Sequence, residues 1–179
     1  MKNNASLWSV PVAVDDIPDT GLHLKIGAPA AIRAEVAELA ELRELSALSG
    51  VFDLVRLGAG VHVTGRVKAK VGQICVVTLE PIESTIEEAV DLEFVPLAAG
   101  VEPAPKTTRK RARDADPPEP LVDGTLDLGA LATEFLILGI DPYPRKPGAE
   151  FAPAPAGDAG ERPFAALEAL KKRLGGGQP

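Results

Sequence analysis

The segment from Val61 to Val71 constrains the fold more than any other part of the chain, because its apolar and polar residues alternate without interruption. The apolar or small set is Val61, Val63, Gly65, Val67, Ala69 and Val71, and the polar set is His62, Thr64, Arg66, Lys68 and Lys70. A period of two is typical of a β-strand with one buried and one wet face. We therefore predict a strand here, a hairpin turn at residues 72–73 and a returning strand over residues 74–79.

Similar patterns occur on both sides of this segment. Strand patterns cover residues 7–14, 22–26, 51–57 and 84–95. Residues 29–44 and 128–139 have the spacing of amphipathic helices. Strands that alternate in this way form antiparallel sheets with one exposed face. We predict an α+β fold, with a curved antiparallel sheet or partial barrel and flanking helices, in which residues 1–97 and 120–151 supply the two parts of the core.

The predicted helix at 128–139 leads into a loop that three prolines stiffen. Asp127 precedes the helix, and its side chain can accept hydrogen bonds from the N–H groups of the first turn. The loop presents the one tyrosine of the chain beside two cations. Tyr143, Arg145 and Lys146 are therefore our first candidates for a partner-binding surface. The alternative is a rigid turn that packs back on the body.

Residues 98–119 have no periodicity and are rich in proline, so we predict a disordered loop there. The loop contains a basic cluster, formed by Lys106, Arg109, Lys110, Arg111 and Arg113. This cluster is a candidate for RNA contact, and a solvated linker is the alternative.

The end of the chain carries a second candidate docking element. Residues 152–160 are typical of a linker, and residues 161–174 have the spacing of a C-terminal amphipathic helix. Phe164 lies on its apolar stripe, where it would either dock on a partner or form part of an internal cap on the core.

The polar side of the 61–71 strand offers another candidate surface. Arg66, Lys68 and Lys70 project from one side at a spacing of two and could follow a phosphate backbone. The neighbouring strand pattern carries the acids Glu87, Asp91 and Glu93 on one side. If the two strands pair, cross-strand ion pairs would cancel the positive face. The sequence supports either arrangement.

The residues needed for catalysis are scarce. A nucleophile needs an adjacent base, and the two histidines, His23 and His62, both fall on the polar sides of predicted strands. We expect the single cysteine, Cys75, to be buried and unreactive, because a reactive thiolate needs cations or a helix N-terminus nearby. No His/Cys cluster has metal-ligand spacing. We therefore predict no catalytic residue, no metal site and no cofactor.

Net charge and hydropathy further narrow the classes of protein to which the chain can belong. The net charge of the 179-residue chain is −7, although residues 106–113 contain five cations and no acid. The rest of the chain is therefore more acidic than the total indicates, which suits a basic partner. No apolar run approaches the roughly 20 residues of a membrane span, and no signal-peptide pattern is present. We expect a cytoplasmic protein without a membrane partner.

Several short motifs follow one another along the chain in a recognisable order. They are Val63–Val71, Cys75–Ile82, Leu126–Gly129, Glu134, Leu136–Leu138, Pro142–Arg145 and the ending Arg162–Leu167. Together they resemble the YceD family, the large ribosomal RNA subunit accumulation proteins of bacteria and plastids. Many members of that family have a cysteine pair of the form C-x-x-C-L-x-P. In this chain Cys75 keeps the first position and Thr78 occupies the second.

The resemblance implies a non-catalytic factor for accumulation of 23S ribosomal RNA and assembly of the large ribosomal subunit. Such a factor would bind precursor ribosomal RNA, a ribosomal protein, or both. One alternative is a metal-dependent RNA-processing enzyme, which would require Glu87, Asp91 and Glu93 to face a cleft. Another is a pure protein–protein adaptor for a basic ribosomal protein.

Overall fold

The computed structural model describes residues 7–96, 118–151 and 167. The chain divides into two compact units, residues 1–146 and 147–179. The predicted linker, nearly all of the predicted 98–119 loop with its basic cluster, and the predicted 161–174 helix apart from Leu167 lie outside the described residues. All elements below belong to the first unit.

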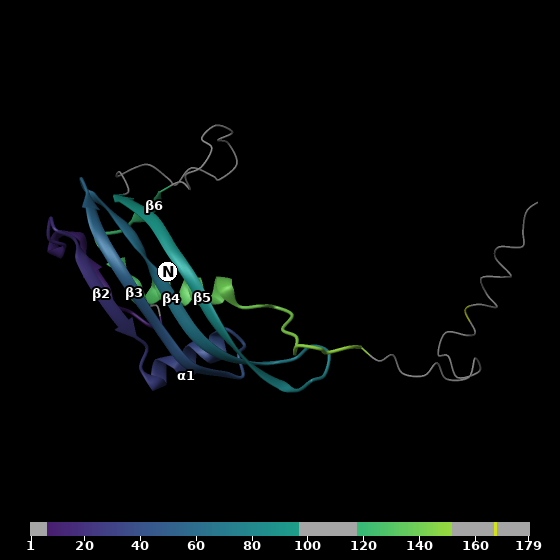
Figure 1. Cartoon of the computed structure of the whole chain (residues 1–179). Helices are drawn as coiled ribbons and strands as arrows, with labels where there is room; N and C mark the ends of the chain where they lie inside the picture. Colours follow the sequence, from purple (N-terminus) through teal and green to yellow (C-terminus); the bar gives the residue numbers. More distant parts are fainter. Residues whose placement is uncertain (1–6, 97–117, 152–166, 168–179) are drawn as a thin grey trace, which may run out of the picture. The chain divides into compact units, whose positions relative to one another are not determined.

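A five-stranded open sheet forms the centre of this unit (Figure 1). In spatial order its strands are β2 (Leu22–Gly27), β3 (Glu44–Leu57), β4 (Gly60–Ile74), β5 (Pro81–Pro96) and β6 (Glu119–Leu121). Neighbours from β2 to β5 are antiparallel, whereas β6 runs parallel to β5. The α+β prediction with a partly curled sheet is confirmed. Strand β6 corrects it in one detail, because it begins at Glu119, which we had placed in the disordered loop.

The hairpin of β4 and β5 is longer than the sequence pattern indicates. The turn predicted at residues 72–73 is wrong, because both residues belong to β4 and the connection comprises residues 75–80. Gly72 pairs with Glu44 of β3 on one side and with Glu83 of β5 on the other. Backbone pairing on both sides therefore keeps the strand going where its side-chain alternation stops.

The first helix, α1 (Ala30–Leu39), ends earlier than the predicted range of 29–44. Glu41 adopts a left-handed backbone conformation with a φ of 53°, which reverses the chain. Leu42 then enters the core, and the N–H of Arg43 donates a hydrogen bond to a carbonyl of β4 at 2.9 Å. The residues after Leu39 are thus drawn into the sheet, and tertiary contacts override their helical spacing.

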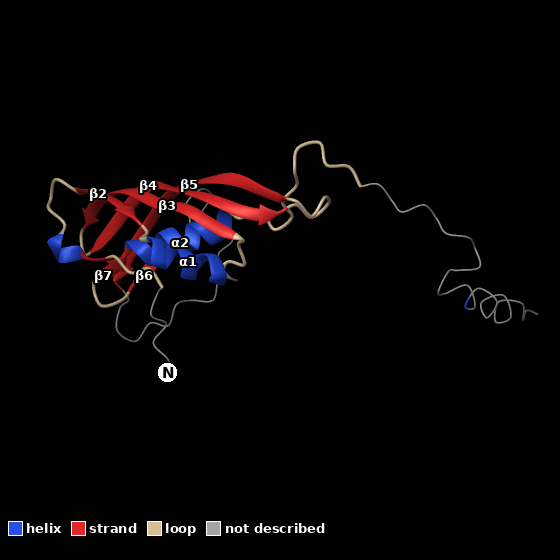
Figure 2. Ribbon diagram, turned by 90° about the horizontal axis from the view of Figure 1, so that it is seen from below, coloured by secondary structure: helices blue, strands red, loops and turns tan. Residues whose placement is uncertain are grey.

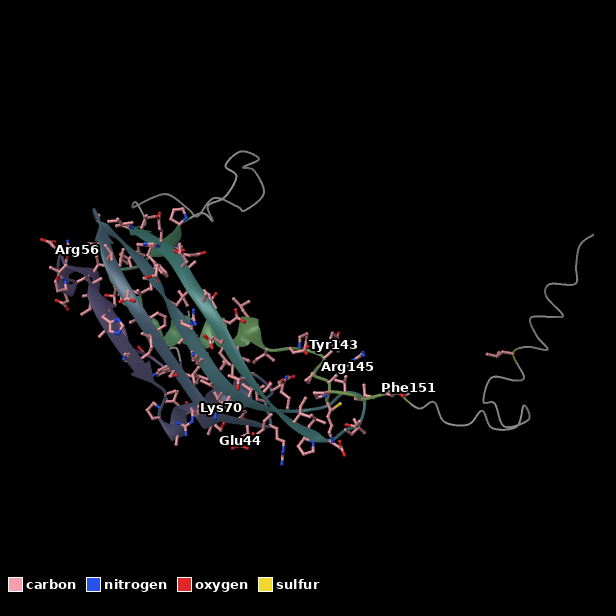
Figure 3. The ribbon with its side chains drawn as sticks, viewed as in Figure 1. Glu44, Arg56, Lys70, Tyr143, Arg145 and Phe151 are labelled. Carbon is pink, nitrogen blue, oxygen red and sulfur yellow. The ribbon has the colours of Figure 1, made fainter. Side chains whose placement is uncertain are left out.

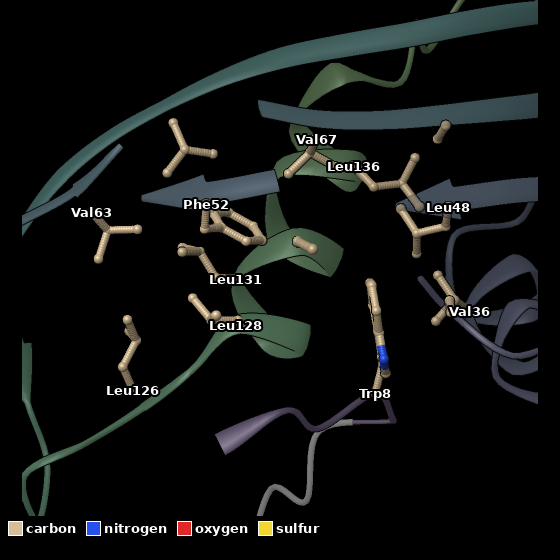
Figure 4. Packing of buried hydrophobic residues seen from close by; sticks show 14 of the residues in the cluster. Trp8, Val36, Leu48, Phe52, Val63, Val67, Leu126, Leu128, Leu131 and Leu136 are labelled. Carbon is tan, nitrogen blue, oxygen red and sulfur yellow. The ribbon is translucent and has the colours of Figure 1, made fainter. Parts of the chain in front are cut away.

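The second helix, α2 (Leu128–Gly139), lies against one face of the sheet (Figure 2). Its residues Leu128, Leu131 and Leu136 point into the same apolar cluster as Phe52 of β3 (Figure 4). Burial of each such leucine side chain contributes about 1.5–3 kcal/mol to the stability of the folded state. Gly65 interrupts the valines of β4 because a Cβ there would collide with the carbonyl oxygen of Val51 and with the ring of Phe52.

A small second sheet connects the N-terminal segment to α2. Strand β1 (Pro11–Ala13) pairs antiparallel with β7 (Thr125–Asp127), and a short 3-10 helix, η1 (Val14–Asp16), follows β1. The strand predicted over residues 7–14 is therefore limited to Pro11–Ala13. Trp8 precedes it and is buried in the core, with 4% of its surface exposed.

The side chain of Asp127 connects the start of α2 to the N-terminal segment. Its Oδ1 accepts hydrogen bonds from the N–H groups of Gly129 (3.0 Å), Ala130 (3.1 Å) and Val10 (2.8 Å), and its Oδ2 accepts one from the hydroxyl of Ser9 (2.7 Å). Burial alone would raise the pKa of Asp127, but these four hydrogen bonds lower it below its ordinary value. The carboxylate therefore caps α2 and anchors the N-terminal segment at once.

Replacing Asp127 with Ala should lower the free energy of unfolding by about 2 kcal/mol or more, because three backbone N–H groups lose their acceptor. Urea denaturation of the variant measures this loss. The matched control is Asp19→Ala, which removes an exposed carboxylate from a turn and should change stability by less than about 0.5 kcal/mol. Equal stability of the two variants would refute the anchoring role of Asp127.

Candidate functional site

The turn between β4 and β5, residues 75–80, is closed by its own backbone. The N–H of Cys75 donates to the carbonyl of Glu80 at 2.8 Å, and the N–H of Leu79 donates to the carbonyl of Cys75 at 3.0 Å. Leu79 has a φ of 59°, in the left-handed region that residues other than glycine adopt at a cost of about 1–2 kcal/mol. Its side chain is 75% exposed. The turn is thus a compact, strained platform at one end of the sheet.

The loop that follows α2, residues 141–146, is anchored to this turn. The Nε2 of Gln73 donates to the carbonyl of Asp141 at 2.9 Å, and the N–H of Val76 donates to the carbonyl of Pro144 at 3.0 Å. Pro144 itself is buried. The backbone of the loop therefore packs back on the body, which is the arrangement that the sequence left as the alternative.

Lys146 has a structural role as well as a charge. Its N–H donates to the Sγ of Cys75 at 3.3 Å, and its Nζ lies 2.8 Å from the Oε2 of Glu80. The hydrogen bond from Lys146 lowers the pKa of Glu80, and the carboxylate in turn raises the pKa of Lys146. The ammonium group of Lys146 is therefore already paired within the protein, unlike the side chain of a residue that is free to bind a partner.

Tyr143 and Arg145 point away from the body (Figure 3). The Oδ1 of Asp141 accepts a hydrogen bond from the N–H of Tyr143 at 2.8 Å, which fixes the backbone just before the exposed residues. The tyrosine side chain is 71% exposed. Within the described part of the chain, Arg145 makes no ion pair. The loop thus combines an anchored backbone with two outward side chains, one aromatic and one cationic.

The environment of Cys75 includes two hydrogen-bond donors that the sequence pattern did not indicate. The residue is fully buried, as predicted. Its Sγ, however, accepts hydrogen bonds from the N–H groups of Lys146 (3.3 Å) and Thr78 (3.4 Å). These hydrogen bonds, with that of Lys146 the largest, lower the pKa of the thiol from 9.0 to about 6. The expected burial of Cys75 is confirmed, and its lack of reactivity stays a prediction. The donor with the largest effect on its pKa lies 71 residues away, so local sequence could not indicate it.

The candidate basic face on β4 is largely compensated by β5. The Nη1 of Arg66 lies 2.5 Å from Oε1 of Glu87, and the Nζ of Lys68 lies 3.1 Å from its Oε2. Hydrogen bonds from Lys68 and then Arg66 lower the pKa of Glu87. Lys70, opposite Thr85, makes no ion pair with the described residues. At about 3.3 Å per residue, Arg66 lies roughly 30 Å along β4 from the turn, so the two candidate surfaces are separate.

The carboxylates considered for metal binding lie on this same exposed face. Glu87 forms ion pairs with Arg66 and Lys68, and the Oδ1 of Asp91 lies 2.7 Å from the Nε2 of His62. Within the ranges that the structure describes, no group of three His, Cys, Asp or Glu side chains is arranged to hold a metal ion. No helix in the same ranges has the length and apolar character to span a membrane.

The remaining candidates cannot be placed. Phe164 and the basic cluster, which comprises Lys106, Arg109, Lys110, Arg111 and Arg113, lie outside the described residues. Sequence reasoning missed the link between the turn and the loop. The available signal was the stiffness that three prolines give residues 142–147, which favours a fixed docking position over a mobile arm.

The chain matches a known protein family. A family model described as large ribosomal RNA subunit accumulation protein YceD matches residues 63–171. This range includes β4, the 75–80 turn, β5, α2 and the 141–146 loop. No curated protein and no solved structure matches the chain.

The thiol of Cys75 should titrate near pH 6, and thiolate absorbance at 240 nm measures its midpoint. A folded pKa below the unfolded value gives stability that is complete above about pH 9 and is lost as the pH falls toward 6. Urea denaturation at both pH values should therefore show higher stability at the upper one, and Cys75→Ser should reduce the difference. A midpoint near 9 would contradict the hydrogen-bonded thiolate.

Proposed function

The chain belongs to the YceD family of large ribosomal RNA subunit accumulation proteins, and from this premise we propose that it is a non-catalytic assembly factor that contacts large-subunit ribosomal RNA through Tyr143 and Arg145. The family description implies a role in accumulation of that RNA and in assembly of the subunit. The direct RNA contact and the residues that make it are our own inference from the geometry of the loop.

The observation that carries this proposal is an exposed aromatic side chain on an immobilised backbone. Asp141 and Pro144 hold the loop on both sides of Tyr143, yet 71% of the tyrosine surface faces solvent. The loop is ordered when the protein folds, so the conformational entropy of ordering it is not lost again when a partner binds. Unpaired RNA bases stack on aromatic rings and on guanidinium planes. Tyr143 and Arg145 supply one of each, two residues apart.

The surroundings of the loop favour stacking over nonspecific attraction to phosphate. The 75–80 turn, on which the loop packs, carries two exposed apolar side chains, Val76 (44% exposed) and Leu79 (75% exposed). The nearest other cation, Lys146, is paired with Glu80. A surface of this kind suits an unstacked base in a loop or bulge of the RNA better than a regular helix, which presents mainly phosphates and hydroxyls.

A non-catalytic role agrees with the arrangement of the acidic side chains. Metal-dependent cleavage of RNA needs carboxylates that converge on metal ions. In the part of the chain that the structure describes, Glu87 and Asp91 instead point along an open sheet face and pair with basic or histidine side chains of β4. This pairing supports binding as the function of the protein.

Replacing Tyr143 and Arg145 with Ala together should weaken binding to a fragment of large-subunit ribosomal RNA by about tenfold or more, since stacking contributes about 1–3 kcal/mol per base. Fluorescence anisotropy with a labelled fragment at fixed salt measures the change. Because both side chains are exposed, the melting temperature should stay the same. A second variant, Lys146→Ala, should instead lower stability slightly, because it removes an exposed ion pair.

The matched control is Arg56→Ala, which removes a cation from the opposite end of the sheet (Figure 3) and should leave the affinity within about twofold. Unchanged affinity in the Tyr143/Arg145 double variant would refute the proposed contact. The non-catalytic role would be refuted if the protein cleaved the RNA fragment in the presence of magnesium and Asp91→Asn abolished this cleavage.

A further inference from the structure

Among the described residues, the edge of the sheet formed by β5 is long and is covered by another strand only near one end. β5 pairs with β4 over Pro81–Phe94, whereas β6 covers only Phe94–Pro96 on the other side. Among the described residues, no other backbone group bonds to the free side of residues 82–93. Figure 1 shows β5 at the margin of the sheet, with β6 only near its end. The opposite edge, β2, is much shorter, with six residues.

Such an edge is a template for another strand, because its outward N–H and C=O groups have no partners within the part of the chain that the structure describes. Proteins commonly blunt such edges with proline, with bulges or with short strands. Residues 82–93 contain no proline, and the pairing of β5 with β4 shows no register shift. α2 reaches the inner side of β5, where Gly139 lies beside Ile86 and Glu88, but it donates no backbone hydrogen bond to the strand.

The charges on this edge define which strand it could accept. Residues 82–93 contain five acids and no Lys or Arg, namely Glu83, Glu87, Glu88, Asp91 and Glu93. Within the described residues, Glu87 and Asp91 have partners on β4, whereas Glu83, Glu88 and Glu93 make no ion pair. Like charges directly opposite each other are destabilising, so two copies of β5 repel one another. Negative charge of this kind excludes self-pairing and selects a basic strand.

We propose that the free edge of β5 binds an extended, lysine- or arginine-rich segment of a partner protein as an additional strand of the sheet. Backbone hydrogen bonds to residues 82–93 supply the alignment. Side chains alternate across a strand, and Glu83, Glu87, Asp91 and Glu93 share the exposed face. Thr85 and Ala89 occupy the same face, and Glu87 and Asp91 already pair with β4. A partner strand with a cation at every second residue therefore finds unpaired acids, within the described residues, at Glu83 and Glu93, near the two ends of the edge. This inference rests on the strand edge alone and is independent of the RNA contact at Tyr143.

A peptide of alternating lysine and threonine is the probe. Added to the full chain, it should shift the backbone amide signals of residues 82–93 and protect them from hydrogen exchange. A lysine–proline peptide of equal charge cannot form a strand and should leave the exchange unchanged. A glutamate–threonine peptide should not bind. These two peptides separate strand addition from simple attraction of charge without altering the protein.

Charge reversal on the edge gives the complementary test. Glu83→Lys with Glu93→Lys should weaken binding of the lysine–threonine peptide by about tenfold or more, since two attractive cross-strand pairs become repulsive. Glu35→Lys with Glu38→Lys makes the same change of net charge on exposed positions of α1 and should leave the affinity within about twofold.

Three results would overturn the proposal. The first is equal binding of the lysine–proline and lysine–threonine peptides. The second is binding without protection of the β5 amides. The third is a shift of the same amides by single-stranded RNA in place of the basic peptide.

Discussion

Burial of one face of β4 beneath α2 is the interaction on which the other features depend. The valines of β4 and the leucines of α2 share one apolar cluster with Phe52, and Asp127 fixes where the helix begins. Because the start and direction of α2 are set in this way, its end delivers residues 141–146 to the turn that follows β4. The position of Tyr143 is thus a consequence of core packing more than 10 residues earlier in the chain.

Sequence patterns located the elements that local periodicity determines and missed the features that long-range contacts determine. The alternation around Val63 and the cap at Asp127 placed β4 and α2, because burial of one face requires that spacing. The same reasoning failed at Gly72 and at Arg43, where pairing between strands decides the conformation. It also missed the hydrogen bond from the N–H of Lys146 to the Sγ of Cys75, which lowers the pKa of the thiol. The spacing of Glu87 did suggest its ion pairs, but only the strand register could select that alternative.

The two proposed surfaces have opposite chemistry, and both involve the hairpin of β4 and β5. One is the loop that packs on the turn of the hairpin, and the other is the outer edge of β5. The 141–146 loop offers an aromatic ring and a guanidinium group, which suit RNA bases. The edge of β5 offers acids, and its backbone groups over residues 82–93 have no outer partner among the residues described, which suits a basic polypeptide. Large ribosomal subunits are assembled from RNA and from basic proteins, so a factor with both surfaces could hold the two components together. Each surface is built on backbone that folding has already ordered, which limits the entropy lost on binding.

Photo-crosslinking from position 143 tests the central claim most directly. A photoreactive phenylalanine analogue at Tyr143 would be activated in cells in which large-subunit precursors accumulate, with Leu57 at the opposite end of the sheet as the control position. The proposed function predicts crosslinks from position 143 to precursor RNA of the large subunit, and none from position 57. Crosslinks from position 143 to protein alone, or equal RNA crosslinking from both positions, would contradict it.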